Sequence, residues 1–90
     1  MIKAVLTVIG CDRVGIIAAV SKMLAEADVN ILDISQNTMD EILTMTMLVD
    51  VTSVKGGFAP LAQNVAALGD QMGLKIRLQH VDIFNAMHKI

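Results

Sequence analysis

The segment from Gly10 to Gly15 contains the residues of this sequence best suited to binding a small molecule. It reads Gly-Cys-Asp-Arg-Val-Gly and links an aliphatic stretch to an amphipathic one. Gly10 allows a sharp turn, and Gly15 leaves room for a ligand at the start of a helix. Free N–H groups and the helix dipole favour a carboxylate there. Because the Asp12 carboxylate could accept a hydrogen bond from an ammonium group, the segment suits an amino acid.

The same spacing also fits an ordinary tight turn, in which Asp12 caps the following helix and Arg13 is solvated. Helix-opening glycines are common, so the spacing alone does not decide between the two interpretations. Two nucleotide motifs are excluded. A dinucleotide fingerprint needs a third glycine, and a phosphate-binding loop needs Lys and Ser or Thr where this chain has Ile16 and Ile17.

Catalytic and metal sites are not indicated. Cys11 could act as a nucleophile only with a base, and the two histidines, His80 and His88, are distant in the sequence. The spacing of these three residues does not match a metal site. We therefore expect Cys11 to be a small buried thiol, and we predict no catalytic residue, metal or cofactor.

The composition limits the number of domains, the classes of binding partner and the cellular compartment. The chain has 90 residues, one cysteine and a formal net charge of −2, with seven scattered basic residues. A single domain over residues 1–90 is expected. Scattered Lys and Arg argue against direct nucleic-acid binding, and apolar runs are too short to cross a membrane. The lone cysteine and the absence of a signal-peptide pattern favour a cytoplasmic protein.

Hydrophobic periodicity predicts a strand–helix–strand unit twice in succession. Strands are expected at 2–9, 31–39, 42–51 and 74–79, helices at 15–27 and 58–72, a hairpin turn at 40–41, and another helical turn within 81–90. This βαββαβ order is the α+β ferredoxin-like pattern, a four-stranded antiparallel sheet with two helices on one face. Val5, Ile9 and Leu48 should lie on the other face, where an apolar patch would suit association between copies.

The residues from Gly10 to Ile16, followed by Asp28-Val29-Asn30-Ile31, resemble the signature of ACT domains, regulatory modules that commonly bind amino acids. The resemblance covers essentially the whole chain and is strongest to small stand-alone ACT proteins related to the glycine-cleavage repressor group. It implies homodimers with extended sheets, in which the ligand lies between the strand–helix loop of one copy and the neighbouring copy. By position, the implied ligand-binding residues are Asp12, Arg13, Val14, Gly15, Ile16, Asn30 and Ile31.

Asp28 departs from this pattern, because relatives often carry glycine at that position. Aspartate tolerates a left-handed backbone, so the fold should not suffer. Its carboxylate near Asn30 could nevertheless repel the carboxylate of an amino acid.

Three functional hypotheses follow. The first is a regulatory homodimer that binds an amino acid or a similar metabolite and signals to a protein partner. The second is a protein-interaction or dimerisation domain that binds no ligand. The third, a small enzyme, lacks an acid–base or nucleophile–base pair at a useful spacing.

Overall fold

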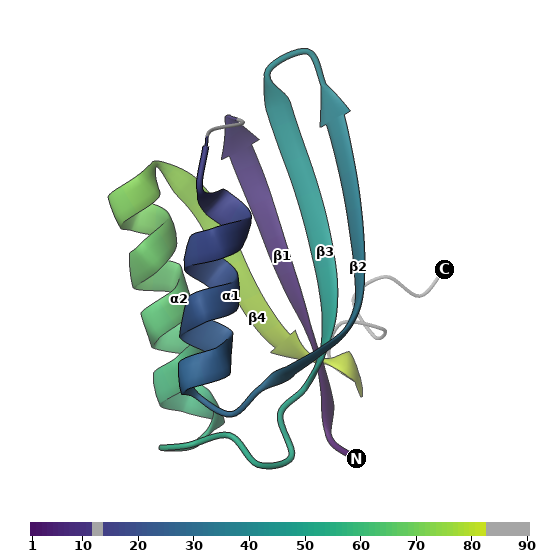
Figure 1. The fold of residues 1–90 in the computed structure, drawn as a ribbon, viewed down its shortest axis with the longest axis vertical. Coiled ribbons are helices and arrows are strands. Elements are labelled where there is room, and N and C mark those ends of the chain that lie inside the picture. The colour runs from purple at the N-terminus through teal and green to yellow at the C-terminus, as the bar shows by residue number, and fades with distance from the viewer. Residues whose placement is uncertain (12–13, 83–90) are drawn as a thin grey trace.

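The computed structural model describes residues 1–11 and 14–82 of the chain, and these form a βαββαβ fold (Figure 1). The elements are β1 (Lys3–Cys11), α1 (Ile16–Glu26), β2 (Asn30–Met39), β3 (Ile42–Asp50), α2 (Phe58–Met72) and β4 (Leu74–His80). Their order and type confirm the ferredoxin-like α+β prediction. The helical turn expected within 81–90 lies largely outside the described residues.

The four strands form one antiparallel sheet in the order β2-β3-β1-β4. Both helices lie on the same face of this sheet, as predicted, and β2 runs beside them without a helix above it (Figure 1). The first and last strands of the order, β2 and β4, are therefore the edges of the sheet. Every residue of β2 is exposed.

The core lies between the helices and the sheet, and the sequence periodicity predicts its members. In α1 the buried residues are Ile16, Val20 and Leu24, spaced by four as one face of a helix requires. In β3 and β4 the buried residues are every second one, as alternation demands. The buried strand residues on the helix side are Ala4, Leu6, Val8, Leu43, Met45, Met47, Val49, Leu74, Ile76 and Leu78.

The opposite face of the sheet, here called the open face, is more polar than expected. The strand register places Val5 between Leu48 and Gln79 and, two residues along, Thr7 between Thr46 and Arg77. The three apolar residues predicted for this face do lie there. However, Val5 is only 7% exposed, and Thr7, Thr46 and Arg77 interrupt the apolar surface. A continuous apolar patch on the open face is therefore not formed.

The β2 strand contains a bulge that the sequence did not indicate. Ile31 pairs with Val49 and Asp33 with Leu48, so Leu32 has no partner in β3. The alternation expected from residue 31 onward is interrupted at this point. Beyond the bulge, regular pairing continues to the predicted turn at 40–41.

The start of the chain is tied to the end of β3 by hydrogen bonds. The Ile2 N–H donates to Thr52 Oγ1 at 2.8 Å, and the Val51 N–H donates to the Ile2 carbonyl at 2.9 Å. The hydroxyl and the N–H of Thr52 both donate to Asp50 Oδ1. These two bonds, the hydroxyl bond foremost, hold the pKa of Asp50 below its ordinary value of 3.8.

This network predicts an acid-dependent contribution to stability. Because the folded pKa of Asp50 is lowered, its contribution is present above the unfolded pKa and is lost as the pH falls through the folded pKa. In Thr52→Val the pKa of Asp50 should rise toward its ordinary value, which an NMR titration of the carboxyl group measures. The control is Thr44→Val, an exposed threonine on β3, which should leave that titration unchanged. If the pKa of Asp50 were equal in the two variants, the Thr52 hydroxyl could not be what lowers it.

Candidate functional site

The first glycine of the Gly10–Gly15 segment does not make the turn that the sequence suggested. The β1 strand continues to Cys11, and Gly10 pairs with Leu43 on one side and Leu74 on the other. A Cβ at position 10 would lie 2.5 Å from Leu74 Cδ2 and 3.3 Å from Leu74 Cα. Gly10 is therefore needed for close packing against β4, not for a change of chain direction.

Gly15 has the conformation and the open space that a ligand-binding turn requires. It is the N-cap of α1 with φ +90°, and no side chain among residues 1–11 and 14–82 hydrogen-bonds to this cap. A Cβ built at Gly15 would meet no atom of the described part of the chain within 4 Å. The first turn of α1 has no acidic residue, so its amides and the helix dipole present a positive potential to solvent. A small anion could bind there.

The other predicted residues of the loop differ in their surroundings. Val14 is 99% exposed, whereas Ile16 is 2% exposed and packs in the core. The Ile16 side chain therefore cannot line an open ligand site, although its backbone lies at the helix start. Asp12 and Arg13 lie outside the described residues.

Asn30 and Ile31 lie far from this loop within one copy of the chain. Asn30 pairs with Asp50, which pairs with Lys3, so Asn30 is level with the start of β1. The loop follows the end of β1, at the opposite end of the sheet. The α1 helix, 11 residues long, spans roughly 16 Å between the two groups at 1.5 Å per residue. A single copy therefore does not bring the predicted ligand residues together.

Asp28 adopts the left-handed conformation that was expected, with φ 58°. Its Oδ2 lies 3.6 Å from Lys55 Nζ, and the Lys55 N–H donates to the Ala27 carbonyl at 2.9 Å. Both charged side chains are more than half exposed, so the pair adds little to stability. It nevertheless places a cation beside the carboxylate that was expected to repel a ligand.

Cys11 is exposed, so the expectation of a buried thiol is wrong. His80 pairs with Ala4, seven residues from Cys11 along β1, a separation of roughly 24 Å at 3.4 Å per residue. The His80 ring stacks on Phe58 with centroids 3.8 Å apart. His80 therefore cannot act as a base for Cys11; His88 is outside the described residues.

Residues 1–11 and 14–82 contain no group of three His, Cys, Asp or Glu side chains that could hold a metal ion. Within the same part of the chain, no helix is long and apolar enough to span a membrane.

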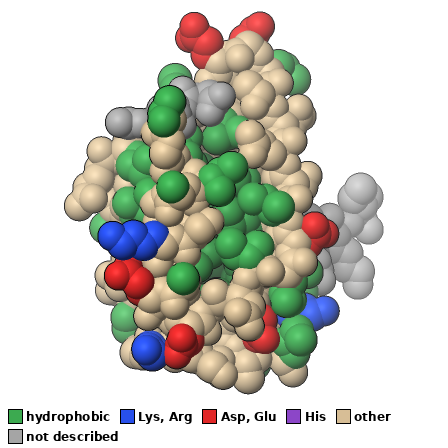
Figure 2. Space-filling model, in the orientation of Figure 1, with side chains coloured by type: hydrophobic (Ala, Val, Ile, Leu, Met, Phe, Trp, Pro, Cys, Tyr) green, Lys and Arg blue, Asp and Glu red, His purple; other side chains and the backbone are tan. Residues whose placement is uncertain are grey.

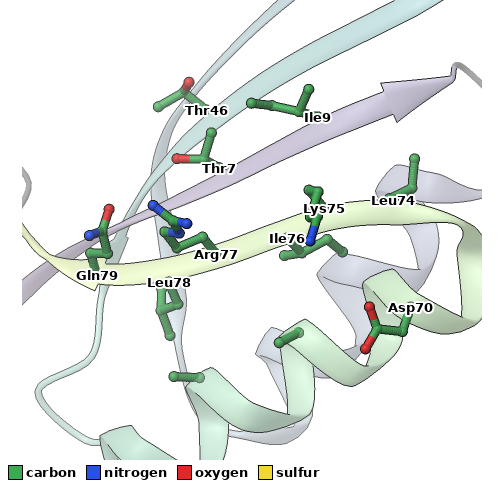
Figure 3. Close-up of a pocket in the computed structure, with 12 residues that line it drawn as sticks. Thr7, Ile9, Thr46, Asp70, Leu74, Lys75, Ile76, Arg77, Leu78 and Gln79 are labelled. Atoms are coloured by element: carbon green, nitrogen blue, oxygen red, sulfur yellow. The ribbon is translucent and has the colours of Figure 1, made fainter.

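A hollow of about 940 Å³ runs along β4, and no pattern in the sequence indicated it. Figure 3 shows Arg77 and Gln79 on the side of β4 where Thr7 and Thr46 lie, while Leu78 points toward α2. None of the predicted ligand residues lines this hollow. It arises because β4 is an edge strand, with no strand paired along its outer edge.

The described residues thus form a βαββαβ fold with a glycine at the N-cap of α1. A family model of the ACT domain matches residues 3–79, and the chain belongs to this family. It is similar over its whole length to small stand-alone proteins of the UPF0237 group. It is 48% identical to the one from Methanocaldococcus jannaschii, over all of both chains. It is 47% identical to one from Listeria monocytogenes, over 98% of this chain and 99% of the relative.

Solved structures agree with this assignment. An ACT domain protein from Streptococcus pneumoniae superposes with a TM-score of 0.79 and 41% identity, over 92% of this chain and 93% of that one. A candidate glycine cleavage system transcriptional repressor superposes with a TM-score of 0.74 and 24% identity, over 89% of this chain and 46% of that one. The second likeness concerns the fold alone.

Proposed function

We propose that this chain is a regulatory module that binds an amino acid or a similar small metabolite as a homodimer. The helix start at Gly15, which receives no side-chain cap from the described residues 1–11 and 14–82 and has no atom of theirs close above it, is the observation that carries the proposal. Its free amides suit a carboxylate. Membership of the ACT domain family, whose members generally bind small regulatory molecules, supports the same function.

The β2 edge, residues Asn30–Met39, is the surface that we propose for the second copy. It contains no Lys, Arg or Pro, the residues that commonly protect an edge strand from pairing. Ile31, Leu32 and Ile34 are 38–44% exposed along it. Figure 2 shows hydrophobic side chains gathered beside the helices, over the strands on the β2 side of the sheet. An edge of this kind favours strand pairing between copies.

Pairing of two β2 edges would also complete the ligand site. If two β2 strands pair in antiparallel fashion about a two-fold axis, Asn30 of one copy lies level with Met39 of the other. Met39 is at the same end of the sheet as Cys11, because both pair with Ile42. The second copy would thus bring its Asn30 toward the end of the sheet where the Gly15 loop lies. This arrangement supports a site shared by two copies.

Calorimetry against the twenty common amino acids tests the ligand. We expect one or a few of them to bind to the dimer, and we expect Asn30→Ala to weaken binding about tenfold, the value of one hydrogen bond to a charged group. The control is Asn64→Ala, an exposed asparagine on α2, which should bind as the wild type does. Silence across the panel at millimolar concentrations, with the protein folded and dimeric, would favour the alternative function, an interaction domain that binds no ligand.

A further inference from the structure

The two edges of the sheet differ in charge. The β2 edge carries a single charged side chain, that of Asp33, whereas β4 carries Lys75 and Arg77. Both cations are exposed on the open face, two residues apart on the same strand. Among the described residues neither of them has an ion-pair partner. The β4 edge is therefore a cationic edge on a chain whose net charge is −2.

The space beside β4 continues around both sides of the strand. On the open face the hollow is bounded by Thr7, Thr46 and the two cations, and on the helix side by Ala62 and Ala66 of α2. The alanines are short, so α2 does not close over the edge. Figure 3 shows Asp70 on α2, on the side of β4 away from Arg77. An extended chain laid along β4 would thus have room for side chains on both of its faces.

The charges decide which extended chain fits. A second copy of β4 paired with this one would place Lys75 and Arg77 among the same cations of the other copy, and like charges across a strand pair are destabilising. Acidic side chains at alternate positions would instead face these cations, because residues i and i+2 of a strand point to the same face. The edge consequently disfavours self-pairing and favours an acidic strand.

We propose that the β4 edge binds an extended acidic segment of a partner protein by strand addition. Two acidic residues, two positions apart, pair with Lys75 and Arg77, and small side chains between them lie against Ala62 and Ala66. Backbone hydrogen bonds along β4 supply the affinity, and the two charge pairs supply the selectivity. This edge is separate from the proposed ligand site, so it gives the regulatory module a second surface through which to contact its partner.

The probe for this proposal is a capped, fluorescein-labelled ten-residue peptide that alternates Glu and Thr. We expect it to bind the wild-type protein, to protect β4 amides from hydrogen exchange, and to bind more weakly as salt is added. In the double variant Lys75→Glu, Arg77→Glu, affinity should fall at least tenfold, and a matched peptide with Lys in place of Glu should bind instead.

The matched control is the double variant Lys22→Glu, Lys55→Glu, which has the same net charge but leaves β4 intact. It should bind the acidic peptide within about twofold of the wild type. If reversal of the β4 charges unfolds the protein, the neutral pair Lys75→Gln, Arg77→Gln replaces it, with a loss of affinity as the expected result.

Four results would overturn the proposal. The first is no binding of the acidic peptide at millimolar concentration, and the second is equal loss in the β4 and control variants. The third is protection of β2 amides rather than β4 amides. A single-stranded oligothymidine that binds more tightly than the peptide, without protecting β4 amides, would point to a general polyanion surface and would also reject strand addition.

Discussion

Replacing Gly69 by valine is expected to lower the free energy of unfolding by about 3 kcal/mol, because α2 lies against the β4 backbone at this residue with no room for a side chain. A Cβ at Gly69 would lie 2.8 Å from the Leu74 carbonyl oxygen and 3.1 Å from the Ile76 nitrogen. Both atoms belong to the backbone of β4, so neither can rotate away. The whole helix would have to move back from the sheet, opening gaps around Leu61 and Val65 in the core.

The size of the loss should depend on the side chain introduced. Alanine adds only the Cβ and is favoured over glycine inside a helix by roughly 1 kcal/mol, so Gly69→Ala should cost less than Gly69→Val. The control is Ala67→Val, which introduces the same side chain at an exposed position of the same helix and should cost less than about 1 kcal/mol. Urea unfolding followed by circular dichroism measures all three. If Gly69→Val and Ala67→Val were equally stable, the close approach of α2 to β4 could not be correct.

The elements and the core were predictable because their signals are local. Alternation in β3 and spacing by four in α1 depend only on which side chains must leave water. The strand–helix–strand order, occurring twice, then limits the topology to a few arrangements, and the observed one is the ferredoxin-like arrangement. The helix predicted at 58–72 ends where expected, and Gly73 follows it with φ 72°.

The roles of other residues depended on distant neighbours and could not be read locally. Gly10 resembles a turn glycine in the sequence. In the structure a glycine is required there because Leu74, which is 64 positions away, packs closely against it. Leu32 fits an alternating pattern, and only its register with β3 shows the bulge. The exposure of Cys11 likewise follows from its place on the open face at the end of β1.

The candidate site also contains one part that the local sequence predicts and one part that depends on how distant segments are placed. Sequence spacing identified Gly15 as a helix start, and the structure places it at the N-cap of α1. That a ligand binds there stays a prediction. The motif also joined this loop with Asn30, although α1 separates the two within one copy. A resemblance in sequence does not state which copy supplies a residue. The separation of the Gly15 loop from Asn30 within one copy is therefore an argument for a site shared by two copies. The property to test is whether the chain forms a homodimer.

The substitution Ile34→Lys on β2 is expected to raise the dissociation constant of the homodimer at least a hundredfold, equivalent to about 2.7 kcal/mol. Ile34 is 44% exposed on an edge that has no cation of its own, so pairing two copies would bury two ammonium groups without partners. Sedimentation over a range of concentrations measures the effect. Binding of the amino acid should weaken together with dimerisation, since two sites shared by two copies are thermodynamically linked to their association.

Ile42→Lys is the matched control for this experiment. Ile42 is also an exposed isoleucine, 55% exposed, so its replacement by lysine is the same chemical change. It lies on β3, however, which is an interior strand. If the copies associate through the β2 edges, Ile42→Lys remains a dimer while Ile34→Lys becomes monomeric. The reverse result would place the contact on the open face and reject edge pairing, since Ile42 shares that face with Cys11. A wild-type protein that stays monomeric at all concentrations would reject the homodimer itself, and with it a ligand site that needs Asn30 from a second copy.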